Sequence, residues 1–153
     1  MNEKPPHFEE LCQQVGFVVL QSQLVEHTLA LFLAVARKLE LGQATAKVHA
    51  ALESDNRKTI ERLLDQVRKQ FPLDADLDAR IWKVKEERNW LVHRLHRESP
   101  NATSSKDEAA PVFARIQRLA EEIIAVLNEL NTIGDNLMVK HGFDLSVVRV
   151  RVY

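Results

Sequence analysis

Between about His7 and Leu41, apolar residues recur every three or four positions, and this spacing constrains the fold more than any other feature. Side chains three and four apart share one face of an α-helix, so the pattern predicts one long helix that Gly42 ends. The stripe consists of Leu11, Val15, Val18, Val25, Leu29, Phe32, Ala36 and Leu39. Further apolar residues widen it and predict contacts on more than one side: Phe17, Leu20, Leu24, Leu31 and Val35.

Helical spacing continues after Gly42. Residues 43–53 are weakly helical, whereas the run from Ile60 to Phe71 has a clear apolar stripe that ends before Pro72. The sequence leaves open whether 43–70 is one helix or two, with Ser54, Asp55 and Asn56 as a candidate cap between them.

Two more helices are expected in the second half of the chain. One runs from about Asp76 to His96, with acids at its positive N-terminal end: Asp74, Asp76 and Asp78. A loop rich in helix-breaking residues covers 98–111. The last helix starts at the capping box Ser105–Glu108 and runs to about His141.

The composition favours few, long elements, because 153 residues include only 4 Gly and 5 Pro. The prediction is an all-α fold, a four-helix up-and-down bundle with long first and last helices. It forms a single domain over 1–153, with tails at 1–6 and 142–153. The alternation from Val148 to Val152 fits an edge strand, a contact with a partner chain or a frayed end, so the role of the tail Val148–Tyr153 stays open.

Charge and cysteine content indicate the class of protein. The net charge of −1 is not the basic balance of a dedicated nucleic-acid binder, although a local patch can still bind phosphate. Cys12 is the sole cysteine, which fits a reducing compartment. Met1 is followed by polar residues, and the apolar run from Thr28 to Ala36 is too short for a membrane span. We therefore expect a cytoplasmic protein without a membrane anchor.

A charged residue interrupts the apolar ladder of the third main helix. The ladder is Leu77, Ile81, Val84, Arg88, Leu91 and Leu95, so Arg88 occupies a core or interface position. A guanidinium keeps its charge, and this position therefore needs an acid, a phosphate or a solvated interface.

Arg88 opens the pattern R-N-x-x-x-H with Asn89 and His93. Asn89 and His93 are four apart and lie near each other on a helix. Arg88 and His93 diverge by roughly 140° on an ideal α-helix. Both reach one site if the arginine side chain wraps, if the helix loosens, or if two copies of the chain combine their residues in a symmetric dimer.

These residue types suit phosphate chemistry. Arginine binds a phosphodiester through two hydrogen bonds, and histidine moves protons near neutral pH. RNA carries its own 2′-hydroxyl nucleophile, so such a site needs no metal or other cofactor. Further candidates for contacts with RNA are Lys85, Arg94, His96 and Arg97.

Three other features accompany this motif. Trp82 and Trp90 either stack a base or, more commonly for tryptophan, anchor a core or interface. Glu26 on the first helix is either a boundary acid with an arginine partner or a supporting carboxylate for the site. His93 and His96 are three apart, but no acid or cysteine nearby completes a metal site.

The segment from Glu87 to His93 resembles the R-x4–6-H motif of HEPN domains, in which Asn is a common first variable residue. Its place on the third main helix of an all-α bundle also matches that family. The resemblance implies a homodimer whose two motifs meet in a cleft, and a metal-independent endoribonuclease. Arg88 would hold the phosphate, His93 would transfer a proton or contact the phosphate, and Asn89 would orient them.

The resemblance also implies a biological role and leaves rivals. HEPN ribonucleases are often toxins or phage-defence components, some paired with a nucleotidyltransferase antitoxin. The main alternative is a non-catalytic helical dimer that binds a protein partner or a nucleotide, with Arg88 and His93 in a structural network. A weaker one is an adaptor that uses the apolar seam from Phe113 to Leu137.

Overall fold

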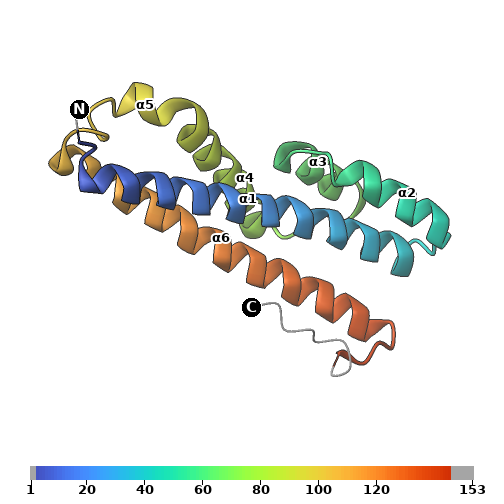
Figure 1. Ribbon diagram of the computed structural model, residues 1–153. Coiled ribbons are helices and arrows are strands. Elements are labelled where there is room, and N and C mark those ends of the chain that lie inside the picture. The colour runs from blue at the N-terminus through green and yellow to red at the C-terminus, as the bar shows by residue number, and fades with distance from the viewer. Residues whose placement is uncertain (1–2, 146–153) are drawn as a thin grey trace. The chain divides into compact units, whose positions relative to one another are not determined.

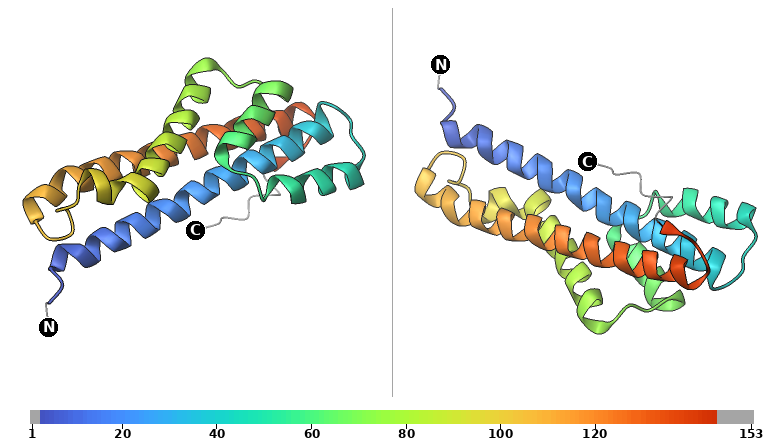
Figure 2. Two further views of the ribbon diagram at one scale, coloured as in Figure 1. Left: turned by 90° about the horizontal axis from the view of Figure 1, so that it is seen from above. Right: turned by 90° about the horizontal axis from the view of Figure 1, so that it is seen from below.

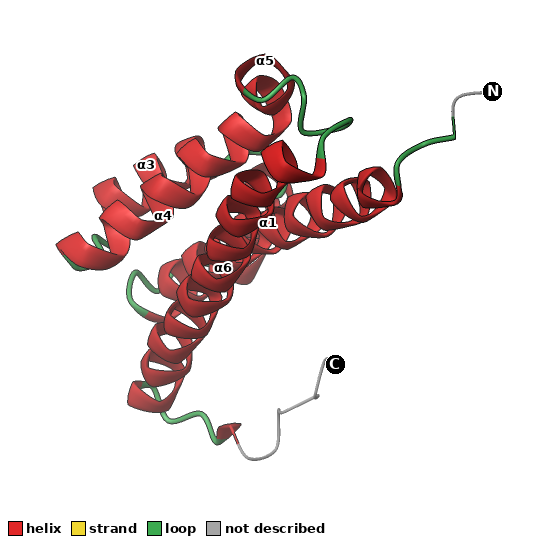
Figure 3. Ribbon diagram, turned by 90° about the vertical axis from the view of Figure 1, so that its left-hand side faces the viewer, coloured by secondary structure: helices red, strands yellow, loops and turns green. Residues whose placement is uncertain are grey.

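The computed structural model describes residues 3–145, and all regular secondary structure in this part of the chain is helical. Helix accounts for 81% of the described residues. The first helix, α1 (Pro6–Leu39), and the last, α6 (Lys106–Lys140), are the longest, which confirms that part of the sequence prediction (Figure 1; Figure 3). The tail Val148–Tyr153 lies outside the described residues.

Residues 43–70 form two helices, which answers the question that the sequence left open. They are α2 (Thr45–Asp55) and α3 (Ile60–Gln70), drawn as separate coils in Figure 2. The expected cap at Ser54–Asn56 is wrong, because Thr59 caps α3 by accepting a hydrogen bond from the Arg62 backbone N–H. Asp55 instead ends α2 with its side chain buried.

Other helix ends follow the sequence closely. The Asp74 side chain caps α4 (Ala75–Asn89) by accepting a hydrogen bond of 2.9 Å from the Leu77 N–H. Ser105 accepts a bond of 3.4 Å from the Glu108 N–H at the start of α6. Gly42 has a positive φ of 60° beyond the end of α1, a conformation that glycine adopts without steric cost.

The sequence predicted one uninterrupted α-helix from about Asp76 to His96 for the third main helix, and this prediction is wrong. After α4 comes a π-helical turn, η1 (Trp90–Arg94), followed by the short α5 (Leu95–Glu98). In η1 the Leu95 backbone N–H bonds to the Trp90 carbonyl, five residues back instead of four. A π-turn is a single local insertion in a helix. The spacing of apolar residues therefore looks the same with or without it.

The chain divides into two compact units. The first comprises Met1–Val25 with Asp74–Val126, and the second comprises Glu26–Leu73 with Leu127–Tyr153. A single domain over the whole chain stays a prediction. The core of the first unit consists of apolar side chains from α1, α4 and α6, among them Leu11, Val18, Leu77, Ile81, Val84, Ile116 and Ile123.

A buried ion pair organises the second unit. Arg37 near the end of α1 bonds to Asp55 on α2 and, through Nε, to the Gln70 side chain on α3 at 3.0 Å. Lys58 adds a second ion pair to Asp55 at 2.7 Å. Three helices are therefore joined by one carboxylate and one guanidinium, both almost completely removed from solvent.

The apolar character of α1 has two physical readings. By length and composition alone, α1 is able to cross a membrane, since an 18-residue window has a mean hydropathy of 1.5. The core helix of a soluble protein passes the same test, and 44% of that window is buried inside the protein. The uninterrupted apolar run from Thr28 to Ala36 is too short to predict this property, which appears only over the longer window.

Candidate functional site

Arg88 lies in the first unit, in the ladder position that the sequence predicted. The ladder residues before and after it on this face, Val84 and Leu91, are buried, and Arg88 itself is half-buried. Its Nε atom is buried and has no hydrogen-bond partner among the described residues. A buried guanidinium donor without an acceptor costs free energy, so this position favours a ligand or partner that supplies an oxygen.

The π-turn begins two residues after Arg88 and contains His93, so it changes the angle between these two side chains. Its hydrogen bonds span five residues, so each residue advances the helix by a smaller angle than in an α-helix. The divergence of roughly 140° for ideal α-helical geometry is therefore reduced. Of the three routes that the sequence left open, the structure contains the loosened helix.

The end of the motif is open to solvent. His93, Arg94, His96 and Arg97 are all exposed, and Asn89 is half-buried at the start of η1. Within residues 3–145, neither the two arginines nor the two histidines form an ion pair. These four side chains are available to an anionic ligand.

Lys85, the fourth predicted RNA contact, is engaged within the protein. Its Nζ lies 2.9 Å from the Glu86 carboxylate and 4.2 Å from the centre of the Trp82 ring. The half-buried Trp82 therefore already stacks on a cation. A contact between Lys85 and RNA stays a prediction. It would require Lys85 to share or give up its contacts with Glu86 and Trp82.

Trp90 is part of the core. It is 2% exposed, and the Arg115 guanidinium from α6 covers its ring at 3.7 Å from the ring centre. Of the two roles weighed for Trp90, the anchor fits this burial and a free platform for a base does not. Its Nε1 is buried without a hydrogen-bond partner in the described chain.

Arg115 is a residue that sequence reasoning missed. It binds both oxygens of the Glu87 carboxylate, at 2.7 and 2.8 Å. These hydrogen bonds, with the nearby charges of Arg115, Lys83 and Arg118, lower the pKa of Glu87. The same bonds raise the pKa of Arg115. Glu87 directly precedes Arg88, so this pair joins α6 to the start of the motif.

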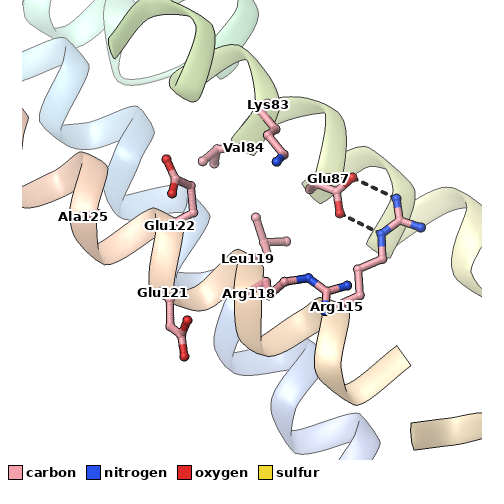
Figure 4. A pocket seen from close by; sticks show the side chains of 9 residues that line it. All are labelled: Lys83, Val84, Glu87, Arg115, Arg118, Leu119, Glu121, Glu122 and Ala125. Atoms are coloured by element: carbon pink, nitrogen blue, oxygen red, sulfur yellow. Dashed lines mark hydrogen bonds and ion pairs between the residues drawn. The ribbon is translucent and has the colours of Figure 1, made fainter. Parts of the chain in front are cut away.

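A pocket of about 660 Å³ opens between α4 and α6 in the first unit (Figure 4). Lys83 and Glu87 line it from α4, whereas Arg115 and Arg118 line it from α6. The sequence showed no sign of it, because its walls are 28 or more residues apart in the chain.

The remaining predictions are distributed over the chain. Glu26 is half-buried on α1 and belongs to the second unit, so its support of Arg88 stays a prediction. The seam proposed for an adaptor is largely used inside the protein, since Ile116, Ile123 and Leu130 are buried. Among the described residues, no group of three or more His, Cys, Asp or Glu is placed to hold a metal ion.

Comparison of the chain with protein-family profiles, with curated proteins and with solved structures finds no match. The function is therefore inferred from the residues themselves. They provide a half-buried guanidinium, an amide and an exposed imidazole on one widened stretch of helix, with two further exposed arginines beyond it.

Proposed function

We propose that this protein is a metal-independent endoribonuclease of HEPN type, and that Arg88, Asn89 and His93 form its active site. The observation that supports this most is the buried Arg88 Nε, which has no hydrogen-bond partner among the described residues and lies five residues before an exposed His93 within a π-turn. A π-turn in a helix is frequently found at a functional site.

The proposed reaction needs only groups that the chain and RNA supply. The 2′-hydroxyl oxygen attacks the adjacent phosphorus, and the bond to the 5′-oxygen breaks to leave a 2′,3′-cyclic phosphate. Arg88 binds the phosphate and stabilises the charge that develops on its oxygens. His93 takes the hydroxyl proton or protonates the leaving oxygen. Asn89 orients the two, and the exposed Arg94, His96 and Arg97, with Lys85, hold the strand.

The proposal includes an assembly and a setting. The chain forms a four-helix up-and-down bundle that dimerises, with the motifs of two subunits in one cleft. It acts in the cytoplasm on RNA, as a toxin or phage-defence component, and an antitoxin such as a nucleotidyltransferase holds it inactive. In this setting α1 is a core helix, and flotation of the expressed protein with membranes would contradict that part.

Cleavage of RNA in the presence of EDTA is the direct test. We expect wild-type protein to cleave RNA. Arg88→Ala and His93→Ala should each lower the cleavage rate at least about 100-fold, which is the lower end of the usual contribution of a general acid or base. His27, exposed on α1, supplies the control, and His27→Ala should cleave at the wild-type rate.

Circular dichroism should show that the variants keep their helical content and melting temperature. If wild-type protein leaves RNA intact at high concentration, the nuclease proposal fails. The non-catalytic module that binds a protein or a nucleotide would then be the better account.

A further inference from the structure

The pocket between α4 and α6 has two cations that no acid of the described chain neutralises. Three acids line it, but Glu87 is held by Arg115 and Glu122 by Arg80 at 2.6 Å. Glu121 accepts a hydrogen bond from Gln117 and points away from the hollow (Figure 4).

The two cations are Lys83 and Arg118, one from each wall. Both are exposed, and neither forms a hydrogen bond or an ion pair with another described residue. Their charges act on Glu87 only at a distance, by lowering the pKa of its carboxyl. A guanidinium and an ammonium that face one hollow form a site that suits a phosphate group.

The surface between these cations is apolar. Val84 and Leu119 lie in the pocket wall with most of their surface buried, and Figure 4 shows Leu119 between the two helices. The volume of about 660 Å³ is in the usual range for pockets that hold a small organic ligand. A phosphate joined to a flat, weakly polar ring fits this combination, and that is the chemistry of a nucleotide.

The pocket is also close to the motif along α4. Lys83 and Arg88 are five residues apart on α4, which is about 7.5 Å along the helix axis and roughly 140° around it, so a strand that contacts both residues must cross the helix. This rise corresponds to about two stacked nucleotides, at ~3.4 Å each. The Glu87–Arg115 pair forms the wall of the pocket on the side of Arg88.

We propose that this pocket binds a nucleotide of the RNA strand that flanks the scissile phosphate, with its phosphate between Lys83 and Arg118 and its base against Leu119. The inference rests on the proposed function for the position of the cut, while binding in the pocket is measurable without cleavage. Base selection in this pocket would then give the enzyme a sequence preference beside the cut.

The binding test uses a short 2′-O-methyl oligoribonucleotide, which has no free 2′-hydroxyl and is not cleaved. Lys83→Gln and Arg118→Gln should each weaken its binding about tenfold, as expected for loss of one charge-assisted hydrogen bond. The slope of log affinity against log salt should fall by ~0.7 for each lost phosphate contact on a single strand. Lys83→Arg should retain binding.

Lys47, exposed on α2 and outside this pocket, supplies the matched control, and Lys47→Gln should bind as wild type does. Lys83 and Arg118 are exposed, so the variants should keep the wild-type melting temperature. A double variant that binds the oligonucleotide as tightly as wild type would overturn the inference. So would a free mononucleotide that binds more tightly than the oligonucleotide, since the site would then be built for a small molecule.

Cleavage assays separate this inference from the proposed function. If both hold, the pocket variants raise KM on RNA and leave kcat near the wild-type value. If no RNA is cleaved but the pocket variants weaken binding, the pocket inference survives and the nuclease proposal fails. If RNA is cleaved with unchanged KM in the double variant, the nuclease proposal survives and the pocket inference fails.

Discussion

Arg115 on α6 donates two hydrogen bonds to the Glu87 carboxylate on α4, from Nε at 2.7 Å and from Nη2 at 2.8 Å. The same guanidinium lies 3.7 Å from the centre of the Trp90 ring. One side chain therefore binds the residue before Arg88 and the first residue of the π-turn. This explains why an arginine 28 positions away in the chain matters for the motif.

Glu87→Gln should destabilise the protein at pH 7 by about 1 kcal/mol, at the upper end for a partly exposed pair. Arg115 lowers the pKa of Glu87 below its usual 4.5, so this stabilisation is complete above that value and is lost as pH falls through the folded-state pKa. Thermal unfolding between pH 7 and pH 3 should show the two proteins converging in acid. The exposed Glu53 is the control, and Glu53→Gln should show no such convergence; parallel curves for Glu87→Gln would refute the role of the pair.

Deleting Val92 should restore α-helical register in η1 and abolish RNA cleavage. Val92 is 44% exposed, so its removal takes little from the core. His93 then becomes the fourth residue after Arg88, about 40° from it on an ideal α-helix, and its imidazole leaves the direction that the π-turn gives it. Val92→Ala keeps the chain length and should cleave as wild type does. A deletion variant that folds and cleaves normally would show that the π-turn is irrelevant to the site.

Arg88→Lys should lower the cleavage rate at least about tenfold although the charge is kept. Lysine has no Nε–H donor at that depth and cannot bind a phosphate through two parallel hydrogen bonds. Single-turnover rates would measure this loss, and the affinity for the 2′-O-methyl oligonucleotide should change less than the rate. If the Arg88→Lys variant cleaves as fast as wild-type protein, residue 88 acts only as a point charge.

Asp55→Asn should destabilise the second unit by about 3–5 kcal/mol, because it leaves the Arg37 charge buried without its counterion. Asp55 is 1% exposed. Asp65 supplies a matched control, since it pairs with Arg68 at 3.6 Å on the surface and Asp65→Asn should change stability by less than ~1 kcal/mol. Urea unfolding would measure both, and similar small losses would contradict the importance of the buried pair.

The exposed apolar face of α1 offers a contact surface for the proposed dimer, and making this face acidic should then dissociate the dimer. Leu20 and Leu24 are 63% and 53% exposed on one face of α1, with Phe17 beside them. The double variant Leu20→Glu, Leu24→Glu should be a monomer by light scattering. Because both side chains are exposed, the monomer should keep its melting temperature. Wild-type protein that is monomeric at micromolar concentration would contradict the dimer itself.

Local sequence predicted the helices and the position of Arg88 well. Apolar spacing, Gly42 and the caps at Asp74 and Ser105 act within one or two turns, so they are legible in the sequence. The failed cap at Ser54–Asn56 has a tertiary cause, because Asp55 is drawn into the ion pair with Arg37. The sequence also revealed the motif Arg88, Asn89 and His93, but it did not predict the geometry of that motif.

The sequence by itself determined that this chain is helical and that a charged residue occupies an apolar ladder. Only the tertiary structure decided what surrounds that residue: the Arg115–Glu87 pair, the covered Trp90, the pocket with Lys83 and Arg118, and the π-turn. The reason is physical. Helix formation depends on neighbours in the chain, whereas ion pairs, stacking and pockets depend on side chains that packing brings together from distant positions.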